Sequence, residues 1–204
     1  MDLPQIYLIT PPDVDLGHFP DQLARVLDST PVACVRLALA TRDEDTLART
    51  ADVLREITHA RDIALVMADH ILLAQRLGLD GVHLGDAARS VRDTRKELGE
   101  DAIIGSFCAV SRHDGMAAGE AGADYVSFGP VAPSALGDGS FAPLELFEWW
   151  SEMIEVPVVA EGGLDAAQIA ALAPFTDFFG IGDEIWRSDS PDTALAALVK
   201  AMQP

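Results

Sequence analysis

The chain has 204 residues, of which 49% are hydrophobic and 23% charged, a composition typical of a globular protein and a length typical of one domain, here residues 1–204. Its net charge of −19 argues against nucleic acids and anionic membranes as partners, and it contains no apolar run of the roughly 18 residues that a membrane span needs. Both cysteines, Cys34 and Cys108, lie in apolar runs, which is typical of reduced core cysteines and indicates a cytoplasmic protein.

Short apolar runs alternate with amphipathic segments along the chain. The runs predict strands at 5–10, 33–39, 63–67, 82–84, 102–108, 125–129, 156–160 and 178–181. The other segments predict helices at 16–28, 43–60, 69–77, 91–98, 111–121, 144–154, 165–172 and 191–202. Short buried strands between helices form parallel sheets, and eight such units in about 200 residues predict an α/β fold, a single (β/α)8 TIM barrel. An open doubly wound sheet is the weaker alternative, because no switch-point fingerprint is present.

The pattern Asp-x4-Gly occurs at 80–85, 124–129 and 177–182. Each copy starts before a predicted strand and ends on a glycine after it, and the three strands are alternate ones. A glycine at the carboxyl end of a strand lets a ligand or another backbone approach closely. The repeat therefore predicts a two-strand unit and one shared site.

Active sites of TIM barrels lie at the carboxyl ends of the strands. Gly162 and Gly163 follow the seventh predicted strand and Gly182 the eighth, where such barrels commonly bind phosphate through backbone N–H groups. We expect a phosphate site there, with simple turn glycines as the alternative. Carboxylates at 161 and 183–184 would repel a phosphate unless a cation lies between them.

Polar residues end the third and fourth predicted strands. Asp69 is a candidate Mg²⁺ ligand, and it is an equally good N-cap for the following helix. His83 is a candidate ligand, acid or base, or else an interior histidine with satisfied hydrogen bonds. Asp86 offers a second carboxylate. Arg36 is a lone cation in an apolar strand, and because burying it unpaired is costly, we expect it to pair with a carboxylate such as Asp69 or to bind an anionic ligand.

Several of these stretches together resemble a known family. They are Tyr7-Leu-Ile-Thr10, the Asp-Gly-Val-His-Leu-Gly run at 80–85, Ile-Ile-Gly at 103–105, Gly-Ala-Asp-Tyr-Val at 122–126, Gly-Pro-Val at 129–131, and Pro-Val-Val-Ala at 157–160 with the following glycine pair. In this order they are similar to thiamine phosphate synthase and its thiazole tautomerase relatives. The resemblance implies a TIM barrel that joins hydroxymethylpyrimidine diphosphate to thiazole phosphate, using Mg²⁺ and releasing diphosphate.

The resemblance also implies roles for particular residues. It gives Asp69 as a Mg²⁺ ligand. We expect Asp86 to supply the second carboxylate in place of the family's own, and Asp69 with His83 to be the catalytic residues. Substrate binding falls to Arg36, His70, Asp86, Ser106, Gly129, Ser134, Gly162, Gly163, Gly182 and Asp183. The partner implied is a phosphorylated or thiamine-related small molecule, and a homodimer is possible.

The chain departs from the family pattern in the site. Leu-Ala-Leu-Ala follows Arg36, where the family has Leu-Arg-Glu-Lys, and Ala88 stands where the second metal carboxylate is usual. The loop containing Ser134 lacks the family's lysine. Two alternatives to synthase activity stay open. One is a non-catalytic barrel that binds a small ligand or a partner protein, and the other is an isomerase or lyase that uses His83 and Asp69.

Overall fold

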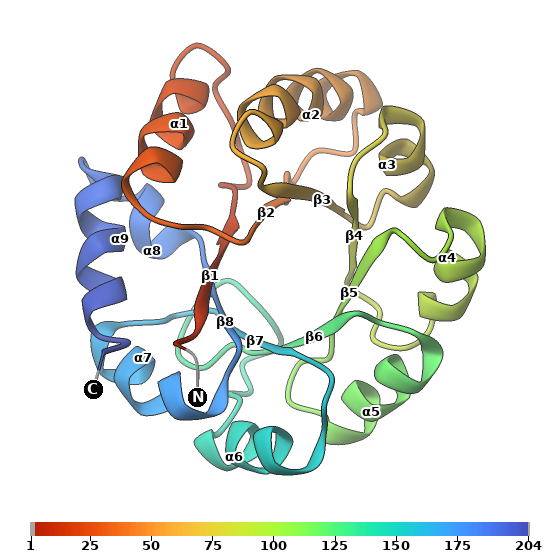
Figure 1. The fold of residues 1–204 in the computed structure, drawn as a ribbon, viewed down its shortest axis with the longest axis vertical. Helices are drawn as coiled ribbons and strands as arrows, with labels where there is room; N and C mark the ends of the chain where they lie inside the picture. Colours follow the sequence, from red (N-terminus) through yellow and green to blue (C-terminus); the bar gives the residue numbers. More distant parts are fainter. Residues whose placement is uncertain (1–2, 204) are drawn as a thin grey trace.

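The computed structural model describes residues 3–203, and within them eight parallel strands close into one barrel (Figure 1). The strands are β1 (Gln5–Ile9), β2 (Cys34–Leu37), β3 (Ala64–Ala68), β4 (Gly81–Leu84), β5 (Ile103–Phe107), β6 (Tyr125–Phe128), β7 (Val158–Glu161) and β8 (Phe178–Ile181). Each strand pairs with the next along the chain, and β8 pairs with β1. The predicted TIM barrel is confirmed.

Helices surround the barrel in the same view (Figure 1). They are α1 (Phe19–Ser29), α2 (Glu44–His59), α3 (Ile71–Leu77), α4 (Val91–Leu98), α5 (Arg112–Ala121), α6 (Leu144–Met153), α7 (Ala166–Leu172), α8 (Asp183–Trp186) and α9 (Pro191–Lys200), with a 3₁₀ turn η1 (Ala173–Phe175). All eight predicted helices are present, and α8 is a short addition after β8. None of the helices in the described part of the chain has the length and apolar character that crossing a membrane requires.

Local side-chain chemistry fixes where several helices begin. The Ser111 hydroxyl accepts the N–H of Asp114 at the start of α5. Asp165 and Gln168 form a reciprocal capping box at the start of α7. Such caps satisfy N–H groups that have no partner inside the helix, so these starts could be predicted to within a residue.

The apolar core has two parts, one on each side of the sheet. Between strands and helices lie large, fully buried side chains such as Leu8, Phe128 and Trp150. Inside the barrel a smaller cluster centres on Tyr7 and Tyr125. Because successive strand residues point to opposite faces, this interior cluster contains every second strand residue and includes polar groups.

Each aspartate of the Asp-x4-Gly repeat ties its strand to the preceding one. Its N–H donates to a backbone carbonyl of that strand, and its carboxylate accepts the N–H of the same residue. The pairs are Asp80 with Leu65, Asp124 with Ile104 and Asp177 with Val158, with carboxylate-to-nitrogen distances of 2.7, 2.7 and 2.8 Å. We call this double contact an aspartate clasp.

The clasps correct one part of the sequence interpretation. The repeat predicted one shared site, but its aspartates lie at the amino ends of the strands and bond to backbone, and only its glycines lie at the carboxyl ends. The amino end of a TIM barrel serves stability. The corresponding residue before β2 is Ala33, which keeps the backbone bond to Ile6 but has no carboxylate.

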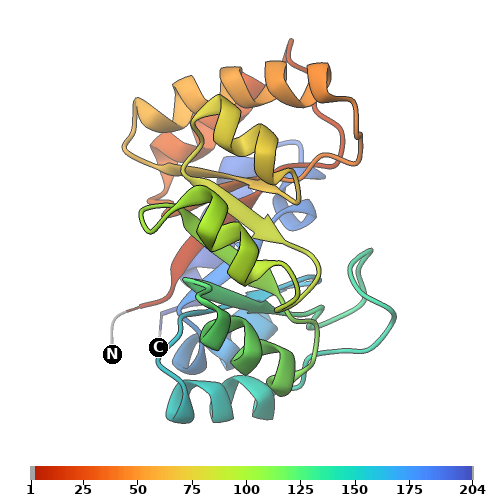
Figure 2. The same ribbon diagram turned by 90° about the vertical axis from the view of Figure 1, so that its right-hand side faces the viewer.

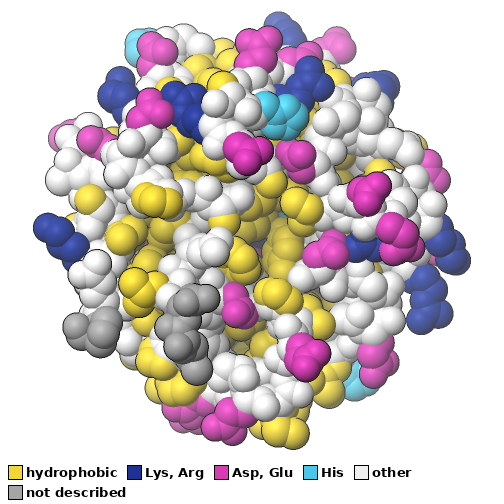
Figure 3. All heavy atoms as spheres, in the orientation of Figure 1, with side chains coloured by type: hydrophobic (Ala, Val, Ile, Leu, Met, Phe, Trp, Pro, Cys, Tyr) yellow, Lys and Arg dark blue, Asp and Glu magenta, His cyan; other side chains and the backbone are white. Residues whose placement is uncertain are grey.

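The two ends of the barrel differ in shape. The loop between β6 and α6 stands out from the end opposite the two termini (Figure 2). The face on which the described chain begins is hollowed at its centre, with hydrophobic side chains gathered there and acidic ones spread around the rim (Figure 3). The projecting loop follows the carboxyl end of β6, and so it marks the end at which a TIM barrel carries its site.

Candidate functional site

A cavity of about 370 Å³ opens at the carboxyl end of the barrel. Residues following β1, β2, β7 and β8 line it together with the projecting loop. Of the predicted site residues, it brings together Arg36, Ser134, Gly162, Gly163, Gly182 and Asp183. The lining does not include Asp69, His70, His83, Asp86, Ser106 or Gly129. The phosphate-side prediction thus converges on one cavity, and the metal-side residues lie apart from it.

A buried ion pair lines this cavity. Arg36 and Glu161 are 6% and 1% exposed, and both guanidinium Nη atoms donate to the carboxylate, Nη1 to Oε1 at 3.3 Å. Burial by itself lowers the pKa of Arg36, but the charge of Glu161 and then Tyr7 more than offset this and raise it above its ordinary value. The expectation that Arg36 pairs with a carboxylate is confirmed, but the partner is Glu161 and not Asp69.

The ion pair continues into a polar network inside the barrel. The Tyr7 and Tyr125 hydroxyls are 2.6 Å apart, and Tyr125 Oη is 2.9 Å from His83 Nδ1. His83 Nε2 lies 4.0 Å from Glu161 Oε1. Burial raises the pKa of both tyrosines. These groups partner one another in part, as buried polar groups require, while the buried Nε of Arg36 has no hydrogen-bond partner among the described residues.

The surroundings of His83 favour its neutral form. Burial, and secondarily the charge of Arg36, lower the pKa of His83 well below its ordinary value. The side chain contacts Tyr125 in a near-parallel stack, with ring centroids 5.7 Å apart. His83 is therefore an interior histidine whose Nδ1 is hydrogen-bonded to Tyr125, and its role as an acid or base stays a prediction.

The lowered pKa of His83 predicts a loss of stability on acidification. Above about pH 6.5 neither the folded nor the unfolded state protonates this histidine. Below about pH 6.5 the unfolded state binds a proton at this histidine and the folded state does not. The free energy of unfolding therefore falls by up to about 1.4 kcal/mol per pH unit until the pH reaches the folded-state pKa. Urea unfolding at pH 7.5, 6.5 and 5.5 measures this.

A variant pair isolates that histidine from other titrating groups. His83→Asn keeps a polar group beside Tyr125 but cannot titrate, so its stability should fall less than that of the wild type between pH 6.5 and 5.5. His113→Asn, at a side chain 87% exposed, should keep the full wild-type slope. Equal slopes in all three proteins would contradict the prediction.

Three backbone N–H groups converge beside the cavity. The N–H groups of Gly163 and Leu164 donate to Glu184 Oε1 at 3.0 and 3.2 Å, and that of Gly182 donates to Glu184 Oε2 at 2.8 Å. We call these three groups the amide cradle. Gly163 has φ +76°, and a Cβ there would lie 2.7 Å from the Ala132 carbonyl oxygen, so only glycine fits. The predicted glycines therefore do bring backbone N–H donors together. The carboxylate of Glu184, which the site prediction omitted, accepts their hydrogen bonds.

The metal-side residues lie at the ends of β3 and β4. Asp69 is exposed, with φ +59°, and its Oδ1 accepts the Gly85 N–H at 2.7 Å. The alternative of Asp69 as a helix cap is wrong, because His70 occupies the cap position of α3 and makes no side-chain cap bond. Asp86 accepts the Ser90 hydroxyl with Oδ2, and its buried Oδ1 has no hydrogen-bond partner. Within residues 3–203 no three His, Cys, Asp or Glu side chains form a metal-holding group.

The remaining predicted residues have structural surroundings. Ser106 is fully buried and donates to the Ala87 carbonyl at 2.8 Å. A Cβ on Gly129 would lie 2.2 Å from the Glu161 carbonyl oxygen, so the glycine allows the two chain segments to approach. Burial raises the pKa of Cys108 to about 11, which keeps it a thiol and agrees with core packing.

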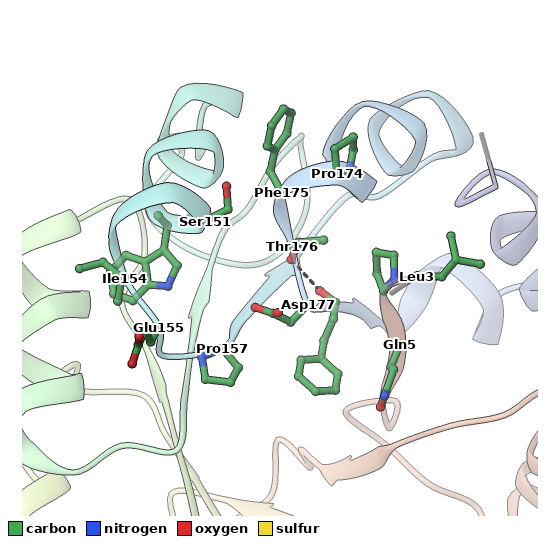
Figure 4. A pocket seen from close by; sticks show the side chains of 13 residues that line it. Leu3, Gln5, Ser151, Ile154, Glu155, Pro157, Pro174, Phe175, Thr176 and Asp177 are labelled. Atoms are coloured by element: carbon green, nitrogen blue, oxygen red, sulfur yellow. Dashed lines mark hydrogen bonds between the residues drawn. The ribbon is translucent and has the colours of Figure 1, made fainter. Parts of the chain in front are cut away.

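A second hollow, of about 490 Å³, lies at the amino ends of β1, β7 and β8 (Figure 4). Leu3, Ile154, Pro174 and Phe175 line it together with polar groups such as Thr176, which donates to the Phe178 carbonyl. None of the predicted site residues reaches it. We place the candidate site in the smaller cavity, because the convergent polar groups lie there.

The matching family model and the most similar curated relatives point to one family. The family model described as "Thiamine monophosphate synthase" matches residues 6–176. The chain is 40% identical to the thiamine-phosphate synthase of Rhodospirillum centenum over 202 residues, 98% of both chains, and 42% identical to that of Erythrobacter litoralis over 191 residues, 91% of this chain and 89% of that one. Among solved structures, thiamine phosphate pyrophosphorylase from Pyrococcus furiosus superimposes with a TM-score of 0.84 at 22% identity, covering 97% of this chain and 95% of that one.

Proposed function

The chain belongs to the thiamine monophosphate synthase family, and from that premise we propose that it couples hydroxymethylpyrimidine diphosphate to the thiazole half of thiamine. The observation that carries the proposal is the 40% identity to a thiamine-phosphate synthase over 98% of both chains. A match of this extent covers every strand end, and so it covers the place where a barrel holds its chemistry.

The coupling exchanges one bond for another. The pyrimidine CH₂–O bond breaks and its electron pair leaves with the diphosphate, while the thiazole nitrogen lone pair forms the new C–N bond. Nothing in this step needs a proton from a side chain. The protein's part is to hold the two rings in line and to stabilise charge on the leaving group.

Asp69 and Asp86 would hold Mg²⁺ in this proposal. The donor set fits, because Mg²⁺ takes one or two carboxylates and completes its shell with water and substrate phosphate oxygens. Asp86 offers a buried oxygen without a partner. Asp69 lies close to it in the fold, because Asp69 accepts the N–H of Gly85, the residue before Asp86. When bound, the ion would neutralise negative charge on the diphosphate. Arg36, the cation that lines the 370 Å³ cavity, is already paired with Glu161, so the leaving group depends on the metal.

We expect Asp69→Asn to lower the coupling rate by about 100-fold without unfolding the protein. The assay incubates the purified protein with hydroxymethylpyrimidine diphosphate, Mg²⁺ and the thiazole, supplied both as the alcohol and as its phosphate, and measures product by mass spectrometry. Removing Mg²⁺ with a chelator should have the same effect.

The matched control is Asp93→Asn, which removes an exposed carboxylate that is paired, among residues 3–203, only with Lys96 and should leave the rate unchanged. Full coupling by Asp69→Asn, or in the presence of chelator, would refute the metal assignment. If no thiazole is coupled, the ligand-binding barrel and the isomerase or lyase alternative become the hypotheses to test.

A homodimer and a cytoplasmic location also remain proposals. The free, buried thiols of Cys34 and Cys108 support a reducing compartment.

A further inference from the structure

A side chain of the protein itself fills the amide cradle beside the 370 Å³ cavity. Glu184 is the second residue of α8. Its two carboxylate oxygens accept all three cradle N–H groups at 2.8–3.2 Å. These distances are those of good charge-assisted hydrogen bonds. A phosphate group that entered the cradle would have to displace a carboxylate already matched to it.

The charges that line the cavity act in the same direction. Its lining contains three carboxylates, Glu161, Asp183 and Glu184, and one guanidinium, Arg36, which gives a formal charge of −3 + 1 = −2. Asp183 is paired with Arg187, and Glu161 with Arg36, so Glu184 is the carboxylate without a cationic partner among the described lining residues. The charge of Glu184 would repel a phosphate dianion beside it.

Glu184 keeps one capacity that a small ligand can use. A carboxylate has about four lone-pair sites. Oε1 accepts two N–H groups and Oε2 accepts one, so Oε2 can accept one more hydrogen bond. An alcohol O–H satisfies that site, whereas a phosphate ester has no donor at neutral pH. The product's thiazolium ring also carries a positive charge, which a cavity of net negative charge favours.

Resting on the proposed coupling, we infer that Glu184 is a specificity-determining residue that makes this chain take the thiazole partner as its free alcohol and reject its phosphate ester. The alcohol donates to Glu184 Oε2 while the thiazole nitrogen attacks the pyrimidine carbon. The bonds that form and break are those of the coupling, and the alcohol is unchanged. The product is then unphosphorylated thiamine together with diphosphate.

Coupling rates with the two thiazole forms test the inference. For the wild type, kcat/KM for the alcohol should exceed that for the phosphate by about 100-fold. Glu184→Ala frees the cradle, so kcat/KM for the phosphate should rise by at least about 10-fold and that for the alcohol should fall, reversing the preference. Asp183→Asn removes one charge without freeing an N–H group and should not reverse it. Glu152→Ala, an exposed carboxylate on α6, should match the wild type.

A binding measurement separates this inference from the proposed function. Titration calorimetry with thiazole phosphate, and with inorganic phosphate, should give binding to Glu184→Ala and none to the wild type, whether or not coupling occurs. Thermal unfolding checks that the variant is folded, and Glu184→Gln, which keeps the side-chain shape, repeats the test if it is not. A wild type that prefers the phosphate, or a folded Glu184→Ala that gains no phosphate binding, overturns the inference. Failure of every protein to couple either thiazole overturns the coupling proposal alone.

Discussion

Glu161→Ala is expected to lower the free energy of unfolding by about 3–5 kcal/mol. The substitution leaves the guanidinium of Arg36 inside the barrel, 6% exposed, with no opposing charge and no acceptor for its two Nη groups. Removing one partner of a buried pair costs far more than the pair contributes, because the remaining charge keeps its desolvation penalty. Urea unfolding followed by circular dichroism measures the loss.

Two variants show whether the loss comes from the orphaned charge. The double variant Arg36→Met with Glu161→Met removes both charges and should recover most of the stability, since hydrophobic replacement of a buried pair is often neutral. Asp28→Ala breaks the exposed pair with Arg61 and should cost at most about 1 kcal/mol. A loss below about 1 kcal/mol for Glu161→Ala would mean that water reaches the pair.

Gly105→Ala is expected to cost about 3 kcal/mol. A Cβ at this position would lie 1.9 Å from the Tyr125 Cζ and 2.2 Å from its hydroxyl oxygen. The ring would therefore have to leave its place and give up its bonds to Tyr7 and His83. The cost combines overpacking of the barrel interior with the loss of partners for buried polar groups.

A double-mutant cycle tests this explanation. Tyr125→Ala alone should cost about 3–5 kcal/mol, and adding Gly105→Ala to it should cost almost nothing more, because the ring that clashes is gone. Gly17→Ala, whose Cβ would meet only the flexible Asp15 side chain, should stay within about 0.5 kcal/mol of the wild type. Additive losses at 105 and 125 would show that the glycine serves another purpose.

The barrel could be predicted because its signal is local and repeated. Each strand is a short apolar run and each helix has its own periodicity and cap, as at Ser111 and Asp165, so errors at element ends do not change the topology. The aspartates of the repeat were visible too, but their purpose was not. A carboxylate before a strand can point to a ligand or to a neighbouring backbone, and only the register of the sheet decides between them.

The site was predictable residue by residue but not pair by pair. The need of Arg36 for a partner follows from its apolar surroundings, yet Glu161 lies 125 residues away on a strand that does not neighbour β2. The sequence indicates Glu184 only as a charge that would repel phosphate. That its carboxylate accepts the cradle N–H groups depends on how α8 directs one side chain toward the turn after the neighbouring strand β7, and no spacing in the sequence expresses this.

The aspartate clasps also bear on the order in which the chain loses conformational entropy as it folds. They join residues 15, 20 and 19 positions apart, whereas the contact of β1 with β8 joins Gln5 to Phe178, which are 178 − 5 = 173 positions apart. Closing the longer loop costs about 2 kcal/mol more chain entropy than closing one of the short ones. Side-chain anchoring is thus placed where the two strands are nearest in sequence. Every clasped pair that forms shortens the free chain between β1 and β8, and so lowers the entropic barrier to sealing the ring.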